Sequence, residues 1–467
     1  MDMDAMQAPF FAYYGDDFTG STDALECLNQ AGLKTVLFID VPNVEQLARY
    51  PGIQAIGVAG MTRTMDPVAM GNELSQAFAA LKALGVRHVH YKVCSTFDSS
   101  PQIGSIGTAA EVGISVFNPR LVPLLVAAPP LGRFCLFGNL FAKMGIGSRG
   151  DIYRLDRHPA ISYHPVTPMQ EADLRLHLSK QTELPIGLVD ILSVHQGVEE
   201  IRIKTQACLD LGIPMVLFDA LHLSDLMPIA EVLDAYGTLE KPLFSIGSSG
   251  VEMAFGMYWK TRGVAKQTVD WPALNRVGKL LVLSGSCSPV TAKQIEYALL
   301  HGFRAVAVPA SAVDPAADLQ TLMRSCIEQT LAFMEAGFPV ILHTSLGQED
   351  ERIAETRELL RQKGYAETEI SAQTARIHGQ VLGEIARYIA RTTDLGRLGV
   401  AGGDTSSLIA RALGIEAVEM IAPFSPGAPL CRAFAPNTPL DGIEINFKGG
   451  QVGDEHYFIK LWGANAS

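Results

Sequence analysis

Apolar runs of strand length alternate with amphipathic helical stretches along almost the whole chain, and this alternation restricts the fold more than any other feature. It is typical of parallel sheets covered by helices on both faces. The runs that we interpret as strands span residues 10–14, 35–39, 55–59, 88–93, 186–189, 214–218, 241–246, 280–283, 305–308, 339–343 and 398–401. The sequence therefore predicts an α/β fold of largely parallel sheets flanked by helices.

Length and one irregular segment predict two domains. A chain of 467 residues is too long for one ordinary hydrophobic core. The segment 259–277 has mixed polarity and no clear period, and it contains Gly263 and Pro272. We therefore predict domains at 1–271 and 272–467. Ligands of such folds bind at the carboxyl ends of strands, so we expect the active site in the cleft between the domains.

Helix-start signals precede several of the helical stretches. Thr167-Pro168 with Gln170 combines a capping hydroxyl, a proline and a capping-box amide, and it predicts a helix over 171–180. Ser288-Pro289 predicts a second helix. A third is expected over 404–413, with Gly414 as its stop.

Composition excludes several classes of partner. The net charge of −12 argues against a nucleic-acid surface, because phosphate backbones are held by clustered Lys and Arg. The seven cysteines contain no CxxC pair and are expected to be reduced thiols. The acidic start of the chain and the lack of a membrane-length apolar run predict no membrane partner and a cytoplasmic location. Assembly into a homo-oligomer stays open.

The tract 91–100 places an ammonium, a carboxylate and several hydroxyls where an apolar strand ends. Such a set suits a small, anionic, polyhydroxylated ligand. Cations at this point are candidates to pair with a substrate carboxylate. An Arg would do so through two parallel hydrogen bonds and a Lys as a point charge. The alternative is that these cations lie on the surface in contact with water. The predicted substrate-binding residues here are Arg63, Lys92, Ser95, Thr96 and Asp98.

Asp16 and Asp17 leave the first predicted strand together. Adjacent side chains on a turn diverge, so one carboxylate can face a ligand hydroxyl while the other caps a helix that begins near Gly20. Taken singly, each aspartate is as well explained by capping as by function. We predict both as substrate-binding and catalytic candidates.

Gly402-Gly403 precedes a predicted helix, and a helix N-terminus beside glycines favours a bound phosphate. Asp404 has three readings: it caps the helix, holds Mg²⁺, or accepts a proton from an attacking hydroxyl. A plain glycine turn with a capping Asp is the alternative. Two further glycine loops resemble this one, and the predicted nucleotide-binding residues are Ser284, Gly285, Ser286, Gly402, Gly403, Asp404, Thr405, Gly449, Gly450 and Gly453.

Other signatures are missing or weak. No P-loop motif occurs, and the GxGxxG match at 145–150 lacks the helix that a dinucleotide fold requires. His88 and His90 share one strand face without a matching ligand cluster, so we interpret them as structural and predict no protein-held metal site.

Taken together, several segments resemble the four-carbon acid sugar kinase family, over nearly the whole chain. The segments are Gly15-Asp16-Asp17-Phe18-Thr19-Gly20, Lys92 with the hydroxyl run after it, His164-Pro165-Val166-Thr167-Pro168-Met169, Ser284-Gly285-Ser286, Gly402-Gly403-Asp404-Thr405 and Lys448-Gly449-Gly450-Gln451-Val452-Gly453. The resemblance implies an N-terminal domain that binds a short sugar acid, a C-terminal domain that binds ATP with Mg²⁺, and phosphorylation of a terminal hydroxyl.

The segment after Lys92 bears on the substrate. Much of the family reads Lys-x-x-Asp-Ser-Thr-x-Arg-Gly here, whereas this chain reads Lys-Val-Cys-Ser-Thr-Phe-Asp-Ser-Ser, which is similar to the 3-oxo-tetronate kinase subgroup. D-threonate and D-erythronate are therefore less favoured alternatives. Departures around 104–107 and 138–159 make the branched 3-oxo-isoapionate a rival substrate. A non-catalytic sugar-acid sensor and a nicotinamide-dependent dehydrogenase are the competing classes.

Overall fold

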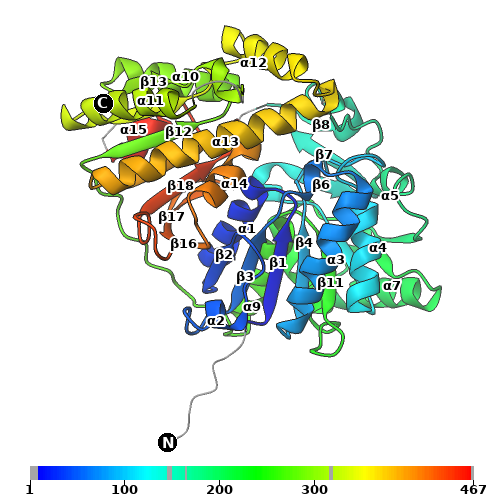
Figure 1. Ribbon diagram of the computed structural model, residues 1–467. Helices are drawn as coiled ribbons and strands as arrows, with labels where there is room; N and C mark the ends of the chain where they lie inside the picture. Colours follow the sequence, from blue (N-terminus) through cyan, green and yellow to red (C-terminus); the bar gives the residue numbers. More distant parts are fainter. Residues whose placement is uncertain (1–8, 145–149, 164–165, 315–318, 464–467) are drawn as a thin grey trace, which may run out of the picture. The chain divides into compact units, whose positions relative to one another are not determined.

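The computed structural model describes residues 9–144, 150–163, 166–314 and 319–463. Residues 145–149 of the GxGxxG match and His164-Pro165 of the family segment lie outside these ranges. The chain divides into two compact units, Met1–Val269 and Asp270–Ser467. Each unit contains a mostly parallel sheet flanked by helices, so the predicted α/β class is confirmed (Figure 1).

The sheet of the first unit has the strand order β2-β3-β1-β4-β11-β5-β10-β9, and every pairing in it is parallel. Its strands are β1 (Phe11–Gly15), β2 (Thr35–Phe38), β3 (Ala55–Ala59), β4 (His88–Lys92), β5 (Val122–Leu125), β9 (Ile186–Val189), β10 (Met215–Phe218) and β11 (Leu243–Gly247). A separate antiparallel sheet consists of β6 (Arg133–Leu136), β7 (Asn139–Lys143) and β8 (Ile152–Arg154).

Helices cover both faces of the first unit's sheet. On one face α3 (Pro67–Ala83) packs beside α4 (Ile106–Phe117), and on the other α1 (Phe18–Gln30) and α8 (Leu223–Asp234) pack against α9 (Gly250–Thr261) (Figure 1). The rings of Phe78, Phe117 and Phe244 lie 5.3 Å apart between the sheet and the first pair. Gly113 of α4 permits this packing, because a Cβ there would lie 2.0 Å from the Phe244 ring.

The remaining helices of this unit are short or peripheral: α2 (Val44–Leu47), α5 (Leu174–Leu178), α6 (Ile191–His195) and α7 (Val198–Asp210). The predicted helix over 171–180 is reduced to α5. Asp173 is the N-cap of α5 and accepts a hydrogen bond from the backbone N–H of Arg175 at 3.0 Å. The cap signal at Thr167 therefore marked the wrong residue.

The sheet of the second unit has the order β13-β14-β12-β15-β18-β17-β16. The strands are β12 (Leu280–Ser284), β13 (Arg304–Ala307), β14 (Val340–His343), β15 (Arg397–Ala401), β16 (Ala417–Ser425), β17 (Ala428–Phe434) and β18 (Glu444–Lys448). Pairings are parallel as far as β18, and β17 pairs antiparallel with both β18 and β16. The carboxyl ends of β12, β14, β15 and β18 therefore lie at one edge.

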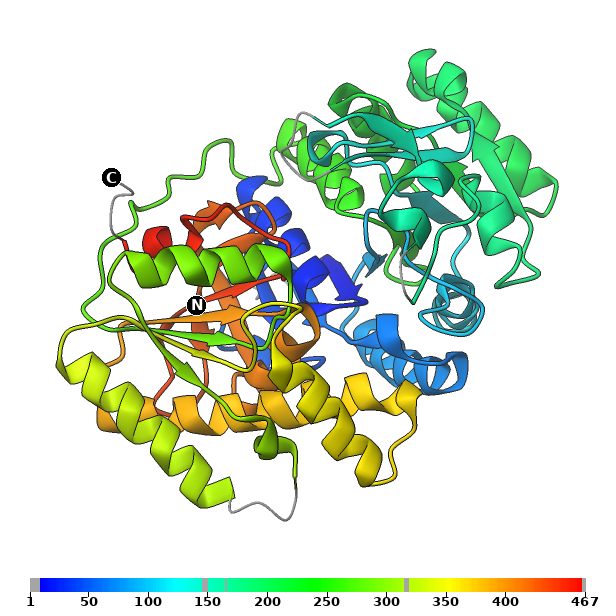
Figure 2. The ribbon, with the colours of Figure 1, turned by 90° about the horizontal axis from the view of Figure 1, so that it is seen from above.

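In the second unit α10 (Pro289–Leu300) packs beside α15 (Tyr457–Trp462), and α13 (Glu367–Thr392) packs with α11 (Leu319–Glu335) and α14 (Gly403–Ala412) (Figure 2). Small residues bring α13 close to α14: a Cβ on Gly379 would lie 2.6 Å from Leu408 and one on Gly383 2.4 Å from Ala412. The helix α12 (Glu351–Gln362) precedes α13. Within the described ranges, no helix is long and apolar enough to cross a bilayer.

Candidate functional site

The carboxyl ends of adjacent strands in the first unit bring Asp16, Arg63 and Lys92 together. Gly15 of β1 is paired with Lys92 of β4, and the backbone N–H of Asp16 donates to the Lys92 carbonyl at 2.9 Å. Arg63 lies on a short 3₁₀ turn (Thr62–Thr64) after β3, and its backbone N–H donates to the Asp16 carbonyl at 3.0 Å. Neighbouring parallel strands therefore place these residues at one edge, as expected for a ligand site.

Arg63 joins the two aspartates. Its Nε and Nη2 donate to the Asp16 carboxylate at 3.0 and 2.6 Å, and its Nη1 donates to Asp17 Oδ2 at 2.6 Å. Burial of Arg63 acts to lower the pKa of its guanidinium. The negative charges of Asp16 and then Asp17 have the larger combined effect, and they hold this pKa well above its ordinary value. A fork bound in this way fixes the direction of both carboxylates.

The two aspartates differ in their surroundings. Asp17 is the N-cap of α1 and accepts from the Gly20 N–H at 2.6 Å, whereas Asp16 caps no helix. Burial raises the pKa of Asp16 above its ordinary value, although Arg63 acts in the opposite direction. A raised carboxyl pKa lies nearer to neutral pH, which favours a role in proton transfer. Asp16 is therefore the stronger candidate for a general base.

Lys92 is only 1% exposed. Its Nζ donates to the Val93 carbonyl at 3.1 Å and lies 3.5 Å from Asp23 Oδ2. Burial opposes its charge, but Asp23 and then Glu252 and Asp16 raise the pKa of Lys92 above its ordinary value. A Cβ at Gly20 would lie 2.7 Å from Asp17 Oδ1, 3.3 Å from Lys92 Nζ and 3.8 Å from Arg63 Nη2, so the Asp17 carboxylate and both cations meet at this glycine.

The hydroxyl run after Lys92 folds into a compact loop. Phe97 adopts a positive φ of 59° and turns the chain. The Thr96 hydroxyl donates to Asp98 Oδ1 at 2.8 Å, and the Cys94 thiol lies 2.9 Å from the same hydroxyl. Burial raises the pKa of Cys94 to about 11, so the thiol is protonated and unsuited to act as a nucleophile. Ser95 is half-buried beside it.

Sequence reasoning assigned no role to three charged residues of this half-site: Asp23, Arg133 and Glu252. Arg133 begins β6 and is 6% exposed, and burial lowers its pKa while Cys94 and Asp98 act in the opposite direction. Its Nη1 donates to backbone carbonyls such as Leu131 at 3.0 Å, but its buried Nε has no hydrogen-bond partner among the described residues. No sequence signal marked Arg133, because a cation at the start of a short strand is usually exposed.

Glu252 is fully buried in α9 near Lys92, and His90 Nε2 lies 3.5 Å from its Oε1. Burial raises the pKa of Glu252 from 4.5 to about 8, with Lys92 acting in the opposite direction. Burial also lowers the pKa of His90 to about 3, so this imidazole is neutral. The sequence signal that could have identified Glu252 is the position of a glutamate on the apolar face of α9.

Replacement of Glu252 by glutamine is expected to change how stability depends on pH. Between pH 4.5 and 8 the folded wild type holds a proton that the unfolded chain has released, so its free energy of unfolding falls as pH rises. The variant lacks this titration, and its stability relative to the wild type should increase across that window. Urea unfolding at several pH values measures the difference. Glu240→Gln, at an exposed position, is the control, and a pH-independent difference for Glu252→Gln would contradict the assignment.

A cavity of about 540 Å³ lies at the carboxyl edge of the second unit's sheet. Five of the predicted nucleotide-binding residues line it, namely Gly285, Ser286, Gly402, Gly403 and Thr405. They come from the loop after β12 and from the start of α14, which follows β15 directly. A volume of this size is typical of a small-molecule site.

Two glycines at this edge have different roles. Gly402 has φ +142°, and a Cβ there would lie 2.2 Å from Thr405 Oγ1, so the turn into α14 requires glycine. Gly403 is the first residue of α14, and a Cβ there would meet nothing within 4 Å. The space beside Gly403 is therefore open to a ligand, at a helix end whose unpaired N–H groups favour an anion.

Buried hydroxyls at the same edge lack hydrogen-bond partners among the described residues: Ser284, Thr405 and Ser407. Thr405 lies 6% exposed between the two glycine loops, since Cβ atoms on Gly285 and Gly402 would both contact its Oγ1. Buried hydroxyls are normally paired, and a ligand in the cavity would supply the missing partner of Thr405. Asp404 lies in the first turn of α14.

The turn after β18 supports the loop after β12. The Gly450 carbonyl accepts hydrogen bonds from the Ser288 hydroxyl and, at 2.9 Å, from Thr291 Oγ1. Gln451 of this turn lines the cavity, whereas Gly449, Gly450 and Gly453 are not among its lining residues. Burial lowers the pKa of the preceding Lys448 to about 7, and its Nζ lies 3.0 Å from Thr291 Oγ1.

The lining of the cavity also contains residues that sequence reasoning missed, above all Arg352 and His378. Arg352 forms a bidentate pair with Asp350 at 2.9 and 2.6 Å and donates to the carbonyl of Val308 at 3.0 Å. The hydrogen bond from Arg352 is the largest cause that holds the pKa of Asp350 at about 2. Burial and the nearby Arg352 lower the pKa of His378 to about 4. The cavity thus presents a fixed cation beside a neutral ring.

Comparison with known proteins matches one family model to each unit. Residues 11–255 match the family described as a sugar-binding N-terminal domain, and residues 281–458 match a nucleotide-binding C-terminal domain. A 3-oxo-isoapionate kinase from Paraburkholderia graminis is 40% identical over 96% of this chain and 93% of its own length. A 3-oxo-tetronate kinase from Pseudomonas fluorescens is 30% identical over 97% of both chains.

Solved structures agree with this comparison at the level of the fold. A protein from Salmonella typhimurium LT2, described as a putative tRNA synthase, superposes with a TM-score of 0.74 at 25% identity, over 97% of this chain and 98% of its own. A Haemophilus influenzae protein superposes with a TM-score of 0.70 at 23% identity, over 97% and 99% of the two chains.

Proposed function

Because this chain belongs to the four-carbon acid sugar kinase family, and is thus a phosphotransferase with an alcohol group as acceptor, we propose that it phosphorylates a short oxidised sugar acid with ATP. The first candidate substrate is 3-oxo-isoapionate, since the relative named for it is 40% identical, against 30% for a 3-oxo-tetronate kinase. The observation that supports the proposal best is the cluster of buried Lys92 and Asp16 with half-buried Arg63 in the unit that matches a sugar-binding domain.

The substrate half-site suits a carboxylated polyol. Lys92 and Arg63 both lie beside Gly20, and they would hold the substrate carboxylate. Ser95, Thr96 and Asp98 would hydrogen-bond the hydroxyls, and Arg133, with its unpaired Nε, would add a further donor.

Asp16 would orient the terminal hydroxyl and accept its proton. The hydroxyl oxygen then forms a bond to the γ-phosphorus, the bond from that phosphorus to the bridging oxygen breaks, and ADP leaves with the electron pair. Asp17 is a weaker candidate for this role because its carboxylate caps α1, and Asp404 is the other candidate. Phosphoryl transfer requires the protein mainly to align the groups and to neutralise charge.

The second unit would bind the nucleotide. The open backbone at Gly403, the N-terminus of α14 and the unpaired hydroxyl of Thr405 fit the phosphates of ATP. Ser284, Gly285, Ser286, Gly402 and the turn 449–453 would shape the phosphate loop, and Arg352 and His378 would contact other parts of the nucleotide. Bound with the triphosphate, Mg²⁺ would supply neutralisation of the phosphate charge.

A panel of acceptors tests the proposal. The protein with ATP and Mg²⁺ is expected to release ADP with 3-oxo-isoapionate or 3-oxo-tetronate, and more slowly with D-erythronate or D-threonate. Mass spectrometry of the product should show one added phosphoryl group on the terminal oxygen. Activity on the first acceptor would also support a role in the catabolism of branched sugar acids.

The same panel separates the alternative function. A sensor that has lost turnover would show ligand-dependent thermal stabilisation without ADP release. No ADP above the ATP-only control with any member, in a protein that binds ATP, would refute the proposed kinase reaction.

A further inference from the structure

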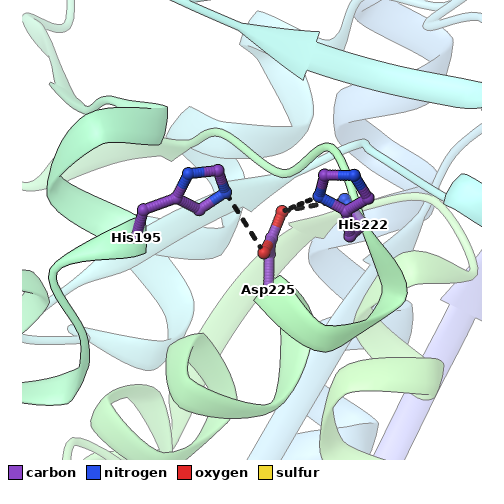
Figure 3. A group of neighbouring side chains, drawn as sticks. All are labelled: His195, His222 and Asp225. Carbon is purple, nitrogen blue, oxygen red and sulfur yellow. Dashed lines mark hydrogen bonds and ion pairs between the residues drawn. The ribbon is translucent and has the colours of Figure 1, made fainter.

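Three potential metal ligands, His195, His222 and Asp225, meet on the first unit (Figure 3). His195 is the last residue of α6, which follows β9, and His222 and Asp225 lie at the start of α8, which follows β10. The order β4-β11-β5-β10 separates β10 from β4 by two intervening strands. At about 4.8 Å between neighbouring strands, three strand spacings separate β10 from Lys92 on β4.

The geometry of the cluster suits one metal ion. His195 Nε2 lies 3.4 Å from Asp225 Oδ1, and His222 Nδ1 lies 3.8 Å from Asp225 Oδ2. One ligand atom from each of the three residues lies within 4.8 Å of the others. Ligand atoms around a tetrahedral Zn²⁺ are separated by about 3.3 Å, since each is about 2.0 Å from the metal. Small rotations of the two imidazoles would therefore complete the geometry.

The carboxylate is held in place before any ion arrives. Asp225 is buried, and its Oδ2 accepts hydrogen bonds from the backbone N–H groups of Leu221 at 2.9 Å and His222 at 2.8 Å. Its Oδ1 faces His195 (Figure 3). Outer-shell hydrogen bonds of this kind orient a ligating group and raise metal affinity. The side chains of His195 and His222 are 46% and 64% exposed, so an ion reaches them directly.

We propose that His195, His222 and Asp225 bind a divalent transition-metal ion of the Zn²⁺ class, with water in the remaining position. Two imidazoles and one carboxylate are ligands that Zn²⁺, Ni²⁺ and Cu²⁺ prefer, whereas Mg²⁺ and Ca²⁺ require oxygen ligands. The bound ion would join the end of α6 to the start of α8 and stabilise the first unit. The two imidazoles distinguish this site from one for Mg²⁺, which would be bound with the nucleotide.

The test uses the untagged full-length protein, stripped with a chelator and titrated with Zn²⁺ in excess Mg²⁺. Isothermal titration calorimetry should give one Zn²⁺ per chain, and the melting temperature should rise on binding. His195→Ala and His222→Ala should each weaken binding by more than about 100-fold, because even outer-shell changes cost about 10- to 100-fold. Substitution with Co²⁺ should give a tetrahedral visible spectrum without a thiolate charge-transfer band, which excludes cysteine ligands.

His456→Ala is the matched control, because His456 Nδ1 lies 3.7 Å from Asp454 Oδ1 but this pair has one imidazole only. Its affinity for Zn²⁺ should equal that of the wild type. Asp225→Asn tests the carboxylate, with circular dichroism to verify that α8 is retained. Equal Zn²⁺ affinity in the wild type and both alanine variants, or no Zn²⁺ binding by the wild type, would overturn the proposal. Neither result affects the proposed kinase reaction, which has its own assay.

Discussion

Replacement of Lys92 by methionine is expected to lower kcat/KM for the sugar acid by about 10²- to 10³-fold, while KM for ATP stays within about threefold. Methionine keeps much of the length of the side chain and removes the charge. Lys92 is buried beside Asp23 and Glu252, so its ammonium is already desolvated and would bind a substrate carboxylate strongly. Steady-state kinetics with each substrate varied in turn measures the two effects.

The loss of activity must be separated from a loss of stability. Without Lys92, the buried Glu252 loses the cation that partly offsets the cost of its ionisation. The double variant Lys92→Met/Glu252→Gln removes the ammonium together with a carboxyl that burial keeps protonated up to about pH 8, and it should regain stability without regaining activity. Lys266→Met, the same change at an exposed position, should leave both unchanged. An equal rise in KM for ATP and for the sugar acid would contradict the assignment of Lys92 to the sugar acid.

The parallel sheets were predictable because their strands are buried on both faces and read as continuous apolar runs. The interpreted runs at 55–59 and 186–189 coincide with β3 and β9. The central strand β5 was missed because its sequence, Val-Pro-Leu-Leu, contains Pro123, which local rules exclude from the middle of a sheet. Strand β16 was missed for another reason: buried and half-buried positions alternate along much of it, and a pattern of that kind differs from the continuous runs elsewhere.

The candidate site was predictable only where residues follow strands. Asp16 and Lys92 each follow or end a strand, so their place at one edge could be expected from the parallel fold. Contacts between distant segments could not be predicted, because spacing along the chain does not determine them. The proximity of Arg133 on β6 to Asp98, and that of Arg352 to His378, depend on tertiary packing. The same holds for His195 and His222, which lie on two different helices.

Replacement of Gly403 by valine is expected to raise KM for ATP by about 10- to 100-fold and to leave binding of the sugar acid unchanged. The valine would displace phosphate from the backbone N–H groups at the start of α14, and charge-assisted hydrogen bonds of this kind contribute about 1.5–3 kcal/mol each. A Cβ at Gly403 meets nothing within 4 Å, so the variant should fold, and the added methyl groups would occupy the space proposed for phosphate. Gly402 is unsuitable for this test, since φ +142° and the 2.2 Å approach to Thr405 would disrupt the turn itself.

The matched control for Gly403→Val is Gly278→Val in the same unit, where a Cβ also meets nothing within 4 Å and the residue does not line the cavity. Nucleotide affinity is measured by calorimetry with a non-hydrolysable ATP analogue, and sugar-acid affinity by thermal shift. The control should bind the analogue like the wild type. If Gly403→Val also binds it normally, phosphate does not lie at the start of α14, and the nucleotide must be placed elsewhere in the cavity. If the affinities for the ATP analogue and for the sugar acid fall together, the substitution has disturbed the fold. In that case the glycine at position 403 is required by the backbone and not by a ligand beside it.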